Sequence, residues 1–415
     1  MSLQQPVDIA LVGTGHRAQT VYQPLFKSLK PWVRVAAVCD PVREHADAYA
    51  ERVGAQAFYS IRELVQSQSV EAALVVAPID LHHAISCYLS QHGIHNLVET
   101  SMCYLLAQGQ EMVQTAQEHK VVFRIAENFF RFPFDRIAAK IADSGFLGPI
   151  KRLTCFHDHT GFHNNSRWIK FYGAHPEFVQ SIEHTMPVAP QYEAPHRFHT
   201  EEKFRARFFT FPENCLVSDI SGNIKGMLGR YNRPGYTELD GARGTIVQYP
   251  KGPRGTAEWD SEAEVRYCSD EALKDGSIAD QVFPIVHETD QNGHWHLTYV
   301  DLPTGRVEYR AHPVPNTSYA RKRHFYAGVI MGHIVDFACA VREGTPSEYT
   351  DEDALMALMM EVGAHESALR DGERLSLPLT GDLESEHQLR EALKKKHGVD
   401  PLDIEGMLNL SVPRP

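Results

Sequence analysis

A glycine-rich turn follows directly on a short apolar run near the start of the chain. In residues 7–18, VDIALVGTGHRA, the run ends at Gly13-Thr14-Gly15, and helix-forming residues come next. Glycines at a strand end let the backbone turn sharply and approach a diphosphate, and the first turn of the following helix supplies N–H donors and a positive dipole. The pattern predicts a strand, a turn and a helix that bind a dinucleotide. The alternative is a glycine-rich loop in another kind of α/β protein.

An acidic residue stands where such a site needs one. The apolar run from Val33 to Cys39 ends in Asp40, about twenty residues beyond the glycines, where a carboxylate binds the adenosine ribose hydroxyls. A carboxylate also repels a 2′-phosphate, so Asp40 predicts NAD rather than NADP.

Length and composition limit the architecture and the partners. The chain has 415 residues, 43% of them hydrophobic and 23% charged, which predicts two domains. The net charge of −12 is spread along the chain, so we expect no nucleic-acid partner. The longest apolar run, 72–79, is too short to cross a membrane, the first residues lack a signal pattern, and the seven cysteines include no C-x-x-C pair. We expect a cytoplasmic protein with reduced thiols and no membrane partner.

Hydrophobic periodicity divides the chain into two regions. Up to about residue 126, short β-branched runs alternate with amphipathic stretches, which is typical of βαβ units around a parallel sheet. We expect strands at 8–12, 34–39, 73–77, 95–98 and 121–125, helices at 61–68, 82–92 and 107–119, and a first helix split by Pro24. Beyond residue 150, extended aromatic-rich runs predict antiparallel strands at 150–159, 204–211, 215–220, 236–249, 263–268, 294–301 and 307–311. Further helices are expected at 319–343, 354–370 and 382–397.

The predicted fold class is therefore α/β, in two domains and an extension. Residues 1–128 are expected to form a Rossmann domain with a doubly wound parallel sheet. Residues 129–380 are expected to form an α+β domain with a large, mainly antiparallel open sheet, and residues 381–415 a helical extension.

Several segments in series resemble the Gfo/Idh/MocA family of nicotinamide-dependent oxidoreductases. They are LVGTGHRA, AVCDP at 37–41, VVAPIDLHH at 75–83, AENFFRFP at 126–133, SGFLGPIKRL at 144–153 and the closing run that begins VDFACAVREG. The resemblance spans nearly the whole chain. It implies the two-domain fold, NAD as cofactor, a sugar, cyclitol or polyol substrate held between the domains, and a homo-oligomer, either a dimer or a tetramer.

The chain departs from the family at the position that matters most for proton transfer. The family usually has Glu-Lys-Pro after the fourth strand of its first domain, and its lysine exchanges a proton beside the reacting carbon. This chain reads Glu99-Thr100-Ser101. A threonine hydroxyl carries no positive charge and is a poor base at neutral pH. The family's later glycine, aspartate and histidine motif is not recognisable in its usual form.

Candidate ligand-binding residues follow from the glycine turn and the resemblance. For the cofactor they are Gly13, Thr14, Gly15, His16, Arg17, Asp40, Ala77, Pro78, His82, Glu99 and Asn128. For the substrate they are Glu99, Arg131, Asn164 and Arg167. A salt bridge at the domain junction is the alternative role for Arg131.

Proton transfer needs a group to replace the lysine, and the segment 155–167, CFHDHTGFHNNSR, offers histidines. Strand alternation puts Cys155, His157 and His159 on one face, with His163 in the loop beyond. A histidine exchanges protons near neutral pH, although polar residues are common in any loop at a strand end. Lys225 between glycines and Tyr172 are further candidates; a solvated turn lysine is the alternative for Lys225. Neighbouring strand residues point to opposite faces, so this segment predicts no metal site.

Three hypotheses of function remain open. The first is an NAD-dependent oxidoreductase that transfers hydride to or from a sugar, cyclitol or polyol. The second is a redox-neutral glycoside hydrolase or lyase that oxidises its substrate transiently with tightly held NAD. The third is a non-catalytic NAD-binding regulator.

Overall fold

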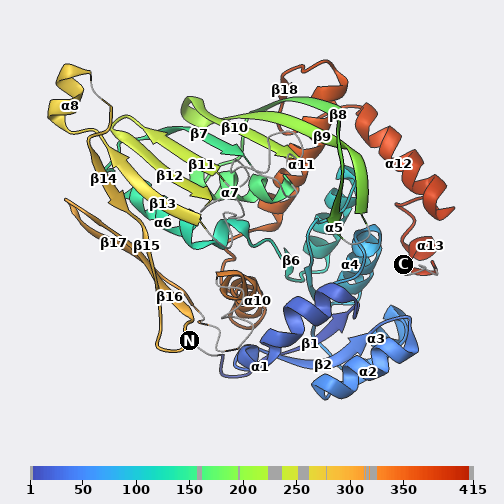
Figure 1. The fold of residues 1–415 in the computed structure, drawn as a ribbon. Coiled ribbons are helices and arrows are strands. Elements are labelled where there is room, and N and C mark those ends of the chain that lie inside the picture. The colour runs from blue at the N-terminus through green and yellow to red at the C-terminus, as the bar shows by residue number, and fades with distance from the viewer. Residues whose placement is uncertain are drawn as a thin grey trace.

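A computed structural model describes residues 3–156, 161–194, 197–222, 236–250, 261–276, 278–312, 314, 317 and 325–410. The N-terminal part is a six-stranded parallel sheet in the order β3-β2-β1-β4-β5-β6, drawn in blue and teal in Figure 1. Its strands are β1 (Val7–Val12), β2 (Val33–Cys39), β3 (Gln56–Phe58), β4 (Ala72–Val75), β5 (His95–Val98) and β6 (Phe123–Ile125). This confirms the predicted Rossmann sheet. The prediction omitted β3, since three residues leave little pattern to read.

Short and long helices connect these strands. After the glycine turn the chain forms a π-helical turn, η1 (Ala18–Tyr22), then η2 (Gln23–Leu25) and α1 (Phe26–Leu29). Pro24 lies in η2 and has no N–H to donate, which accounts for the predicted break in the first helix. The others are α2 (Arg43–Val53), α3 (Ile61–Ser67), η3 (Ile79–Leu81), α4 (His82–Gln91) and α5 (Leu106–Glu118). Of these, α2 was not predicted.

The second part of the chain is built on a nine-stranded sheet in the order β14-β13-β12-β11-β7-β10-β9-β8-β18. All its neighbours pair antiparallel except β7 and β10, so the predicted, mainly antiparallel sheet is confirmed. Its strands are β7 (Ile150–Phe156), β8 (Phe178–Ala194), β9 (Arg197–Phe211), β10 (Cys215–Gly222), β11 (Tyr236–Gly241), β12 (Gly244–Pro250), β13 (Ser261–Tyr267), β14 (Gln281–Pro284) and β18 (Leu375–Ser376). A separate three-stranded sheet contains β15 (Val286–Thr289), β16 (Trp295–Leu302) and β17 (Gly305–Arg310).

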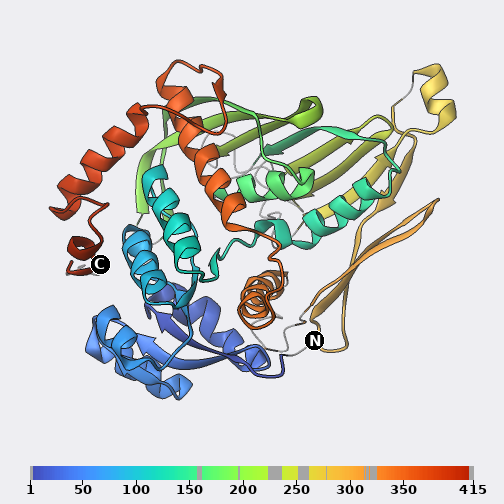
Figure 2. The ribbon, with the colours of Figure 1, turned by 180° about the vertical axis from the view of Figure 1, so that it is seen from behind.

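Helices cover the face of the large sheet that looks toward the first domain, as Figure 2 shows from behind. They include α6 (Pro133–Asp143), α7 (Phe162–Tyr172) and α11 (Asp351–Leu369). Along β9, Phe209 and Phe211 are buried against this layer, whereas Phe208 is 38% exposed on the other face. Smaller elements are η4 (Phe129–Arg131), η5 (Pro212–Asn214), α8 (Asp270–Asp275), α12 (Glu384–His397) and α13 (Ile404–Leu408).

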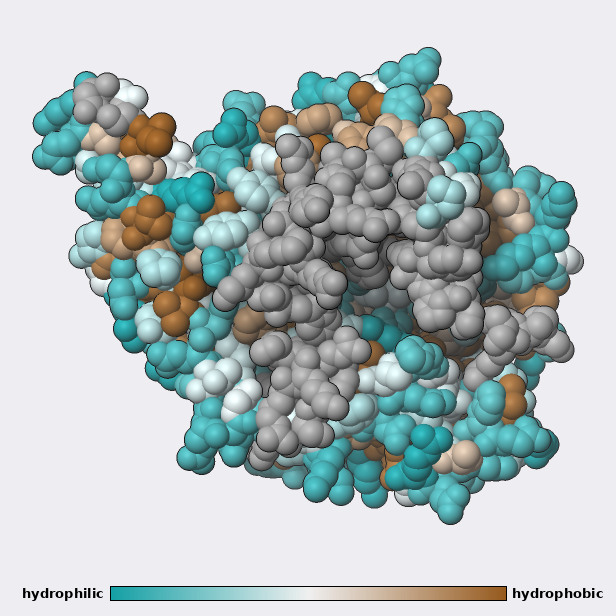
Figure 3. Space-filling view, viewed as in Figure 1, coloured by the Kyte–Doolittle hydropathy of each residue, from teal (hydrophilic) through white to brown (hydrophobic). Residues whose placement is uncertain are grey.

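Helix α10 (Phe325–Glu343) follows the second domain's strands in sequence but packs on the first domain's sheet. Its Ile330, Ile334 and Phe337 share one buried cluster with Ile9 and Leu11 of β1. It is the one helix in the described ranges that is long and apolar enough to cross a membrane, yet its apolar residues are used in this packing. Hydrophilic residues predominate among the described residues in the space-filling view of Figure 3. All seven cysteines are free.

Candidate active site

A cleft of about 1010 Å³ opens between the two parts of the molecule. One wall is the carboxyl end of the parallel sheet, where Arg17, Ala77 and Glu99 lie. The opposite wall comes from α7, β9 and α11 and includes His163. Ligands of open α/β sheets bind at this edge of the strands, and large clefts of this size accept small molecules.

The glycine turn leaves room for a ligand at one point and forms a tight backbone contact at another. Gly13 has a φ of +95°, and a Cβ built on it would lie 2.7 Å from the Val76 carbonyl oxygen. A Cβ built on Gly15 would meet no atom within 4 Å. The turn is therefore packed against β4 through Gly13 and open above Gly15, which fits a dinucleotide diphosphate at this position.

Asp40 stabilises the same turn through hydrogen bonds. The carboxylate is buried; its Oδ2 accepts hydrogen bonds from the Thr14 amide at 2.9 Å and the Thr14 hydroxyl at 2.7 Å. Oδ1 accepts from the Val42 amide at 3.0 Å. Asp40 thus shapes the turn directly, and it lies beneath the cleft lining.

A charged network surrounds Glu99 at the end of β5. Glu99 accepts hydrogen bonds from Arg17 Nε at 2.5 Å, the Tyr22 hydroxyl at 2.7 Å and the Thr100 amide at 2.8 Å. Arg17 also donates to the hydroxyl of Tyr326 on α10. Burial alone would raise the pKa of Glu99, but Arg17 and Tyr22 outweigh it and lower that pKa to about 2. The carboxylate is therefore ionised throughout the physiological range.

Thr100, the residue for which the resemblance leads one to expect a lysine, belongs to this network. The Thr100 hydroxyl donates to Glu99 Oε2 at 3.1 Å. Behind it, Nε2 of His333 lies 3.5 Å from the Tyr22 hydroxyl, and burial lowers the pKa of His333 to about 3. The positive charge at this end of the cleft therefore resides on Arg17.

A histidine and a carboxylate meet at the domain junction. Nδ1 of His163 lies 2.9 Å from Oε2 and 3.0 Å from Oε1 of Glu127, and both side chains are buried. The imidazole stacks on Phe129 with ring centroids 4.2 Å apart and planes 3° apart. Glu127 is itself held by the amides of Asn128 and Phe129, at 2.8 and 3.0 Å. The imidazole is thus fixed in position and orientation in the cleft wall.

Asn128 supplies an acceptor beside this pair. Its side chain lines the cleft, and its buried Oδ1 has no hydrogen-bond partner among the described residues. A buried acceptor without a donor is costly. The carboxamide of a nicotinamide ring offers such a donor, so Asn128 and Gly15 together fit an NAD molecule lying along this edge.

Comparison with known proteins also indicates an NAD-binding fold for the N-terminal domain. Residues 7–127 match the model GFO_IDH_MocA, described as an oxidoreductase family with an NAD-binding Rossmann fold. The N-terminal domain belongs to this family. The family model describes an NAD-binding fold, which agrees with the cofactor that the sequence predicts.

Similar proteins extend the comparison. A 2,7-anhydro-N-acetylneuraminate hydratase of Mediterraneibacter gnavus is 28% identical over 156 residues, 38% of this chain and 40% of that protein. The chain spans about two-fifths of the length of the curated relatives it matches. An oxidoreductase from Agrobacterium radiobacter in complex with NAD+, L-tartaric acid and magnesium has a TM-score of 0.64 at 13% identity, covering 90% of this chain and 98% of that one. Levoglucosan dehydrogenase in complex with NADH and levoglucosan has a TM-score of 0.63 at 16% identity, covering 90% of this chain and 100% of that one. These structures share the two-domain fold.

The structure places some predicted residues in the Gfo/Idh/MocA cleft. His16, Arg17, Ala77, Glu99, Asn128 and His163 line it. His163 was expected in a loop but lies in the first turn of α7, because the helix begins at Phe162, directly after Gly161. His157, His159 and Lys225 lie outside the described residues. In the described part of the chain no group of three potential ligands is placed to hold a metal ion.

Other predicted residues have structural roles away from the cleft. Arg131 is committed to Glu348 and to Asp336 at 3.1 Å, the junction salt bridge that was its alternative. The ring of Tyr172 packs on Phe211, with centroids 4.9 Å apart. Pro78 and His82 lie beside the cleft, and His82 is buried with its ring nitrogens 2.9 and 2.8 Å from the carbonyl oxygens of Ala77 and Ser101.

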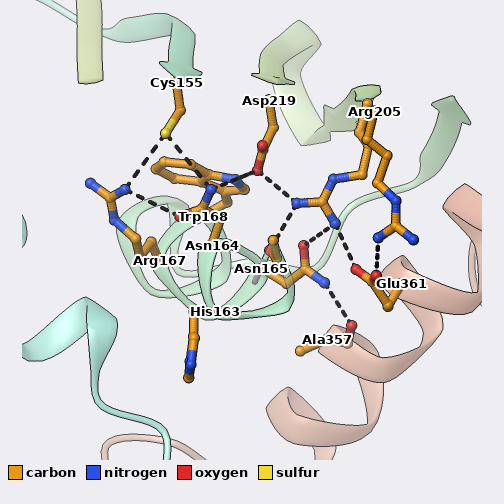
Figure 4. Close-up of polar contacts among 12 residues, drawn as sticks. Cys155, His163, Asn164, Asn165, Arg167, Trp168, Arg205, Asp219, Ala357 and Glu361 are labelled. Atoms are coloured by element: carbon orange, nitrogen blue, oxygen red, sulfur yellow. Dashed lines mark hydrogen bonds and ion pairs between the residues drawn. The ribbon is translucent and has the colours of Figure 1, made fainter. Parts of the chain in front are cut away.

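Asn164 and Arg167 lie on the buried side of α7 and are not among the residues that line the cleft, so the structure lends no support to the substrate role predicted for them. Figure 4 shows them on the side of the helix away from His163. Asn164 donates to Asp219 at 3.1 Å, and Arg167 pairs with Asp135 at 3.0 Å. Asn164 thus ties α7 to β10 of the sheet, and Arg167 ties it to α6.

Sequence reasoning missed Glu127, Tyr326 and His333. Glu127 is the second residue of the quoted segment AENFFRFP and comes two positions after the end of β6, so its place after that strand was the available signal. Tyr326 and His333 come from α10, and nothing local in their sequence indicates that this helix returns to the first domain.

Proposed function

We propose that this protein is an NAD-dependent oxidoreductase that acts on a sugar, cyclitol or related polyol in the cleft between its domains. One observation carries the proposal: the Glu127–His163 pair lies in the same cleft as the Asn128 carbonyl, which has no partner among the described residues, and as His16 and Arg17, which directly follow the open glycine turn. A proton-transfer group and a dinucleotide site in one cleft are the two requirements of alcohol oxidation.

His163 is the residue to which we assign the proton. Glu127 accepts the hydrogen bond from Nδ1, which selects the tautomer whose Nε2 takes up a proton. When NAD is bound, it supplies the acceptor for the hydride of the substrate's C–H bond. His163 then receives the hydroxyl proton at Nε2 as the carbonyl forms, and Glu127 stabilises the resulting imidazolium.

Arg17, held in place by Glu99, supplies the positive charge that the lysine supplies in the family. The Thr100 hydroxyl donates to Glu99, and the described part of the chain offers it no partner that would make it a base. The Arg17 guanidinium stays protonated: burial lowers its pKa, but Glu99, Tyr22 and Tyr326 together raise that pKa above its ordinary value. Arg17 therefore fixes a positive charge in the cleft without exchanging a proton.

The test begins with the coenzyme. Purified protein is examined for NAD that copurifies and is titrated with NAD and NADP in a calorimeter. A panel of sugars, cyclitols and polyols is then followed at the NADH absorbance. NAD binding with NADH release supports the proposal, and no NAD binding at millimolar concentration overturns it. NAD binding without turnover of any substrate would instead support a regulator.

A redox-neutral reaction is the second candidate, favoured by two observations. One relative is named as a hydratase, and the lysine position is occupied by Thr100. In that reaction, transient oxidation by tightly held NAD permits elimination or water addition without net NADH. Stoichiometric, non-exchanging NAD and cleavage of a glycoside with no NADH accumulation would distinguish it from the first candidate.

We further propose a cytoplasmic homo-oligomer. The seven free cysteines suit a reducing compartment. The large sheet's uncovered face carries apolar side chains, with Ile182 48%, Phe208 38% and Leu216 38% exposed. A second copy packing there would remove them from water.

A further inference from the structure

The cleft continues well beyond the Glu127–His163 pair. It follows one face of α11, whose Ala354, Leu358, Glu361 and His365 all line it. About three helical turns, or about 16 Å, separate Ala354 from His365. A single sugar ring beside His163 would therefore leave empty the far end of the cleft, which is the end near His365.

The C-terminal extension closes this far end. Glu386 and Leu389 of α12 line it together with Tyr104 from the loop before α5. The Glu386 carboxylate holds α12 in place by accepting from the Leu106 amide at 2.8 Å. Together with α11, these two segments form the wall at this end, and the three meet only in the folded chain.

Polar donors face this end. Arg205 is held through Nε by Glu183 at 2.7 Å and through Nη1 by Glu361, which leaves Nη2 with no hydrogen-bond partner in the described ranges. His365 contacts Glu183 through Nδ1 at 3.2 Å, and its Nε2 has no partner within the same ranges. Tyr104 adds an aromatic ring and a hydroxyl that likewise lacks a partner among the residues described.

The charges at this end favour a neutral ligand. The inward-facing basic residues Lys203, Arg205 and Arg207 are matched by Glu183, Asp219 and Glu361. Figure 4 shows Arg205 reaching Glu361, and Arg207 of the same strand pairs with Glu361 at 2.8 Å. Glu386 adds a further carboxylate, so an anionic ligand would meet repulsion, whereas hydroxyl groups would find both donors and acceptors.

We propose that the far end of the cleft, lined by Tyr104, Arg205, Glu361, His365 and Leu389, is a second subsite for a neutral sugar ring. The substrate would then be a disaccharide or glycoside, with one ring beside His163 and the other along α11. This inference rests on the proposed function and adds the size and charge of the substrate.

Binding of matched saccharides tests the subsite. With NAD present, the affinities of cellobiose, maltose, lactose and melibiose are measured by calorimetry against those of D-glucose and D-galactose. At least one disaccharide is expected to bind about tenfold or more tightly than its monosaccharides, the effect of one or two hydrogen bonds to charged groups.

Two tryptophan variants locate the effect. Leu389→Trp fills the far end without removing an ion pair, and Glu391→Trp places the same side chain on an exposed position of the same helix. The first is expected to abolish the disaccharide advantage and keep monosaccharide affinity, and the second to change neither. His365→Ala is expected to reduce the advantage several-fold.

Two results would overturn the subsite: no disaccharide binds more tightly than its monosaccharides, or the advantage survives Leu389→Trp. Either result can occur while NAD binds and monosaccharides are oxidised, so the failure of this inference is distinguishable from failure of the proposed function.

Discussion

Oε2 of Glu127 lies 2.9 Å from Nδ1 of His163, across 36 positions of sequence and at the point where the two domains join. The carboxylate is fixed by two backbone amides, so it holds the imidazole ring of His163 in one orientation. This contact distinguishes His163 from the other histidines as the one whose replacement should lower turnover.

Replacing His163 by Gln is expected to lower kcat about 10²- to 10⁴-fold, since the variant retains volume but cannot accept the proton. NAD affinity measured by calorimetry should stay within a few-fold. His175→Gln is the matched control, because His175 binds Asp353 at 3.0 Å and does not line the cleft. Equal turnover of the His163 variant and the wild type would remove the assigned role.

The two glycines of the turn should respond differently to alanine. Gly15→Ala adds a methyl group to open space, so folding is preserved and NAD binding weakens at least tenfold because the diphosphate loses its room. Gly13→Ala forces a positive φ and a 2.7 Å contact on the turn, and should cost about 2 kcal/mol or more of unfolding free energy. Thermal melting and NAD titration of both variants separate the effects. A Gly15 variant with wild-type NAD affinity would contradict the assigned diphosphate position.

Asp40→Asn should narrow the preference for NAD over NADP, because the amide keeps the side chain's shape and removes its charge. The buried position of Asp40 adds a second effect: the Thr14 bonds weaken, so affinity for both coenzymes should fall. Parallel titrations with NAD and NADP measure both effects. Asp47→Asn, an exposed change on α2, is the control. An unchanged ratio of the two affinities would exclude a role for the Asp40 charge in selecting the coenzyme.

Local spacing made the first domain predictable, whereas the site depends on contacts that span the chain. The glycine turn, the acid after β2 and the helix break at Pro24 are each determined within a few residues. Glu99, by contrast, accepts hydrogen bonds from Tyr22 and Arg17, which lie far upstream in the sequence. Arg17 in turn donates to the hydroxyl of Tyr326 on α10.

The second domain shows where periodicity misleads. Strand β8 was not predicted, because Pro187 and Pro190 within 178–194 are typical of turns, although prolines are tolerated toward strand ends and irregular pairing. Extending the alternation of β7 to residue 159 moved His163 into a loop. Its place on a helix became apparent only with the backbone.

Glu99→Gln should destabilise the protein at neutral pH. The pKa of Glu99 falls from 4.5 in the unfolded chain to about 2 when folded, which corresponds to about 3 kcal/mol. A depressed carboxyl pKa contributes stability above pH 4.5 and loses it as the pH falls toward 2. The difference in unfolding free energy between variant and wild type, measured with denaturant, should therefore be largest at pH 7 and much smaller at pH 3. Glu51→Gln, exposed on α2, should show no such dependence. A difference independent of pH would contradict the assigned charge state.

Phe208→Asp should dissociate the proposed oligomer. Phe208 and Leu216 are exposed on neighbouring strands of the uncovered sheet face, so a charge there opposes burial against a second copy. Light scattering should report a higher-order wild type and a smaller variant. Leu273→Asp is the control, since Leu273 is 47% exposed on α8, away from that face. A monomeric wild type would remove the proposal of self-association.

Helix α10 has a consequence for the order in which the molecule is assembled. Residues 325–343 complete the hydrophobic packing over β1. The N-terminal domain therefore cannot reach its final packing until about four-fifths of the chain has been synthesised. A fragment that stops near residue 128 would leave that apolar surface in water. The N-terminal domain is therefore not an independent folding unit: it reaches its final packing only together with the second domain.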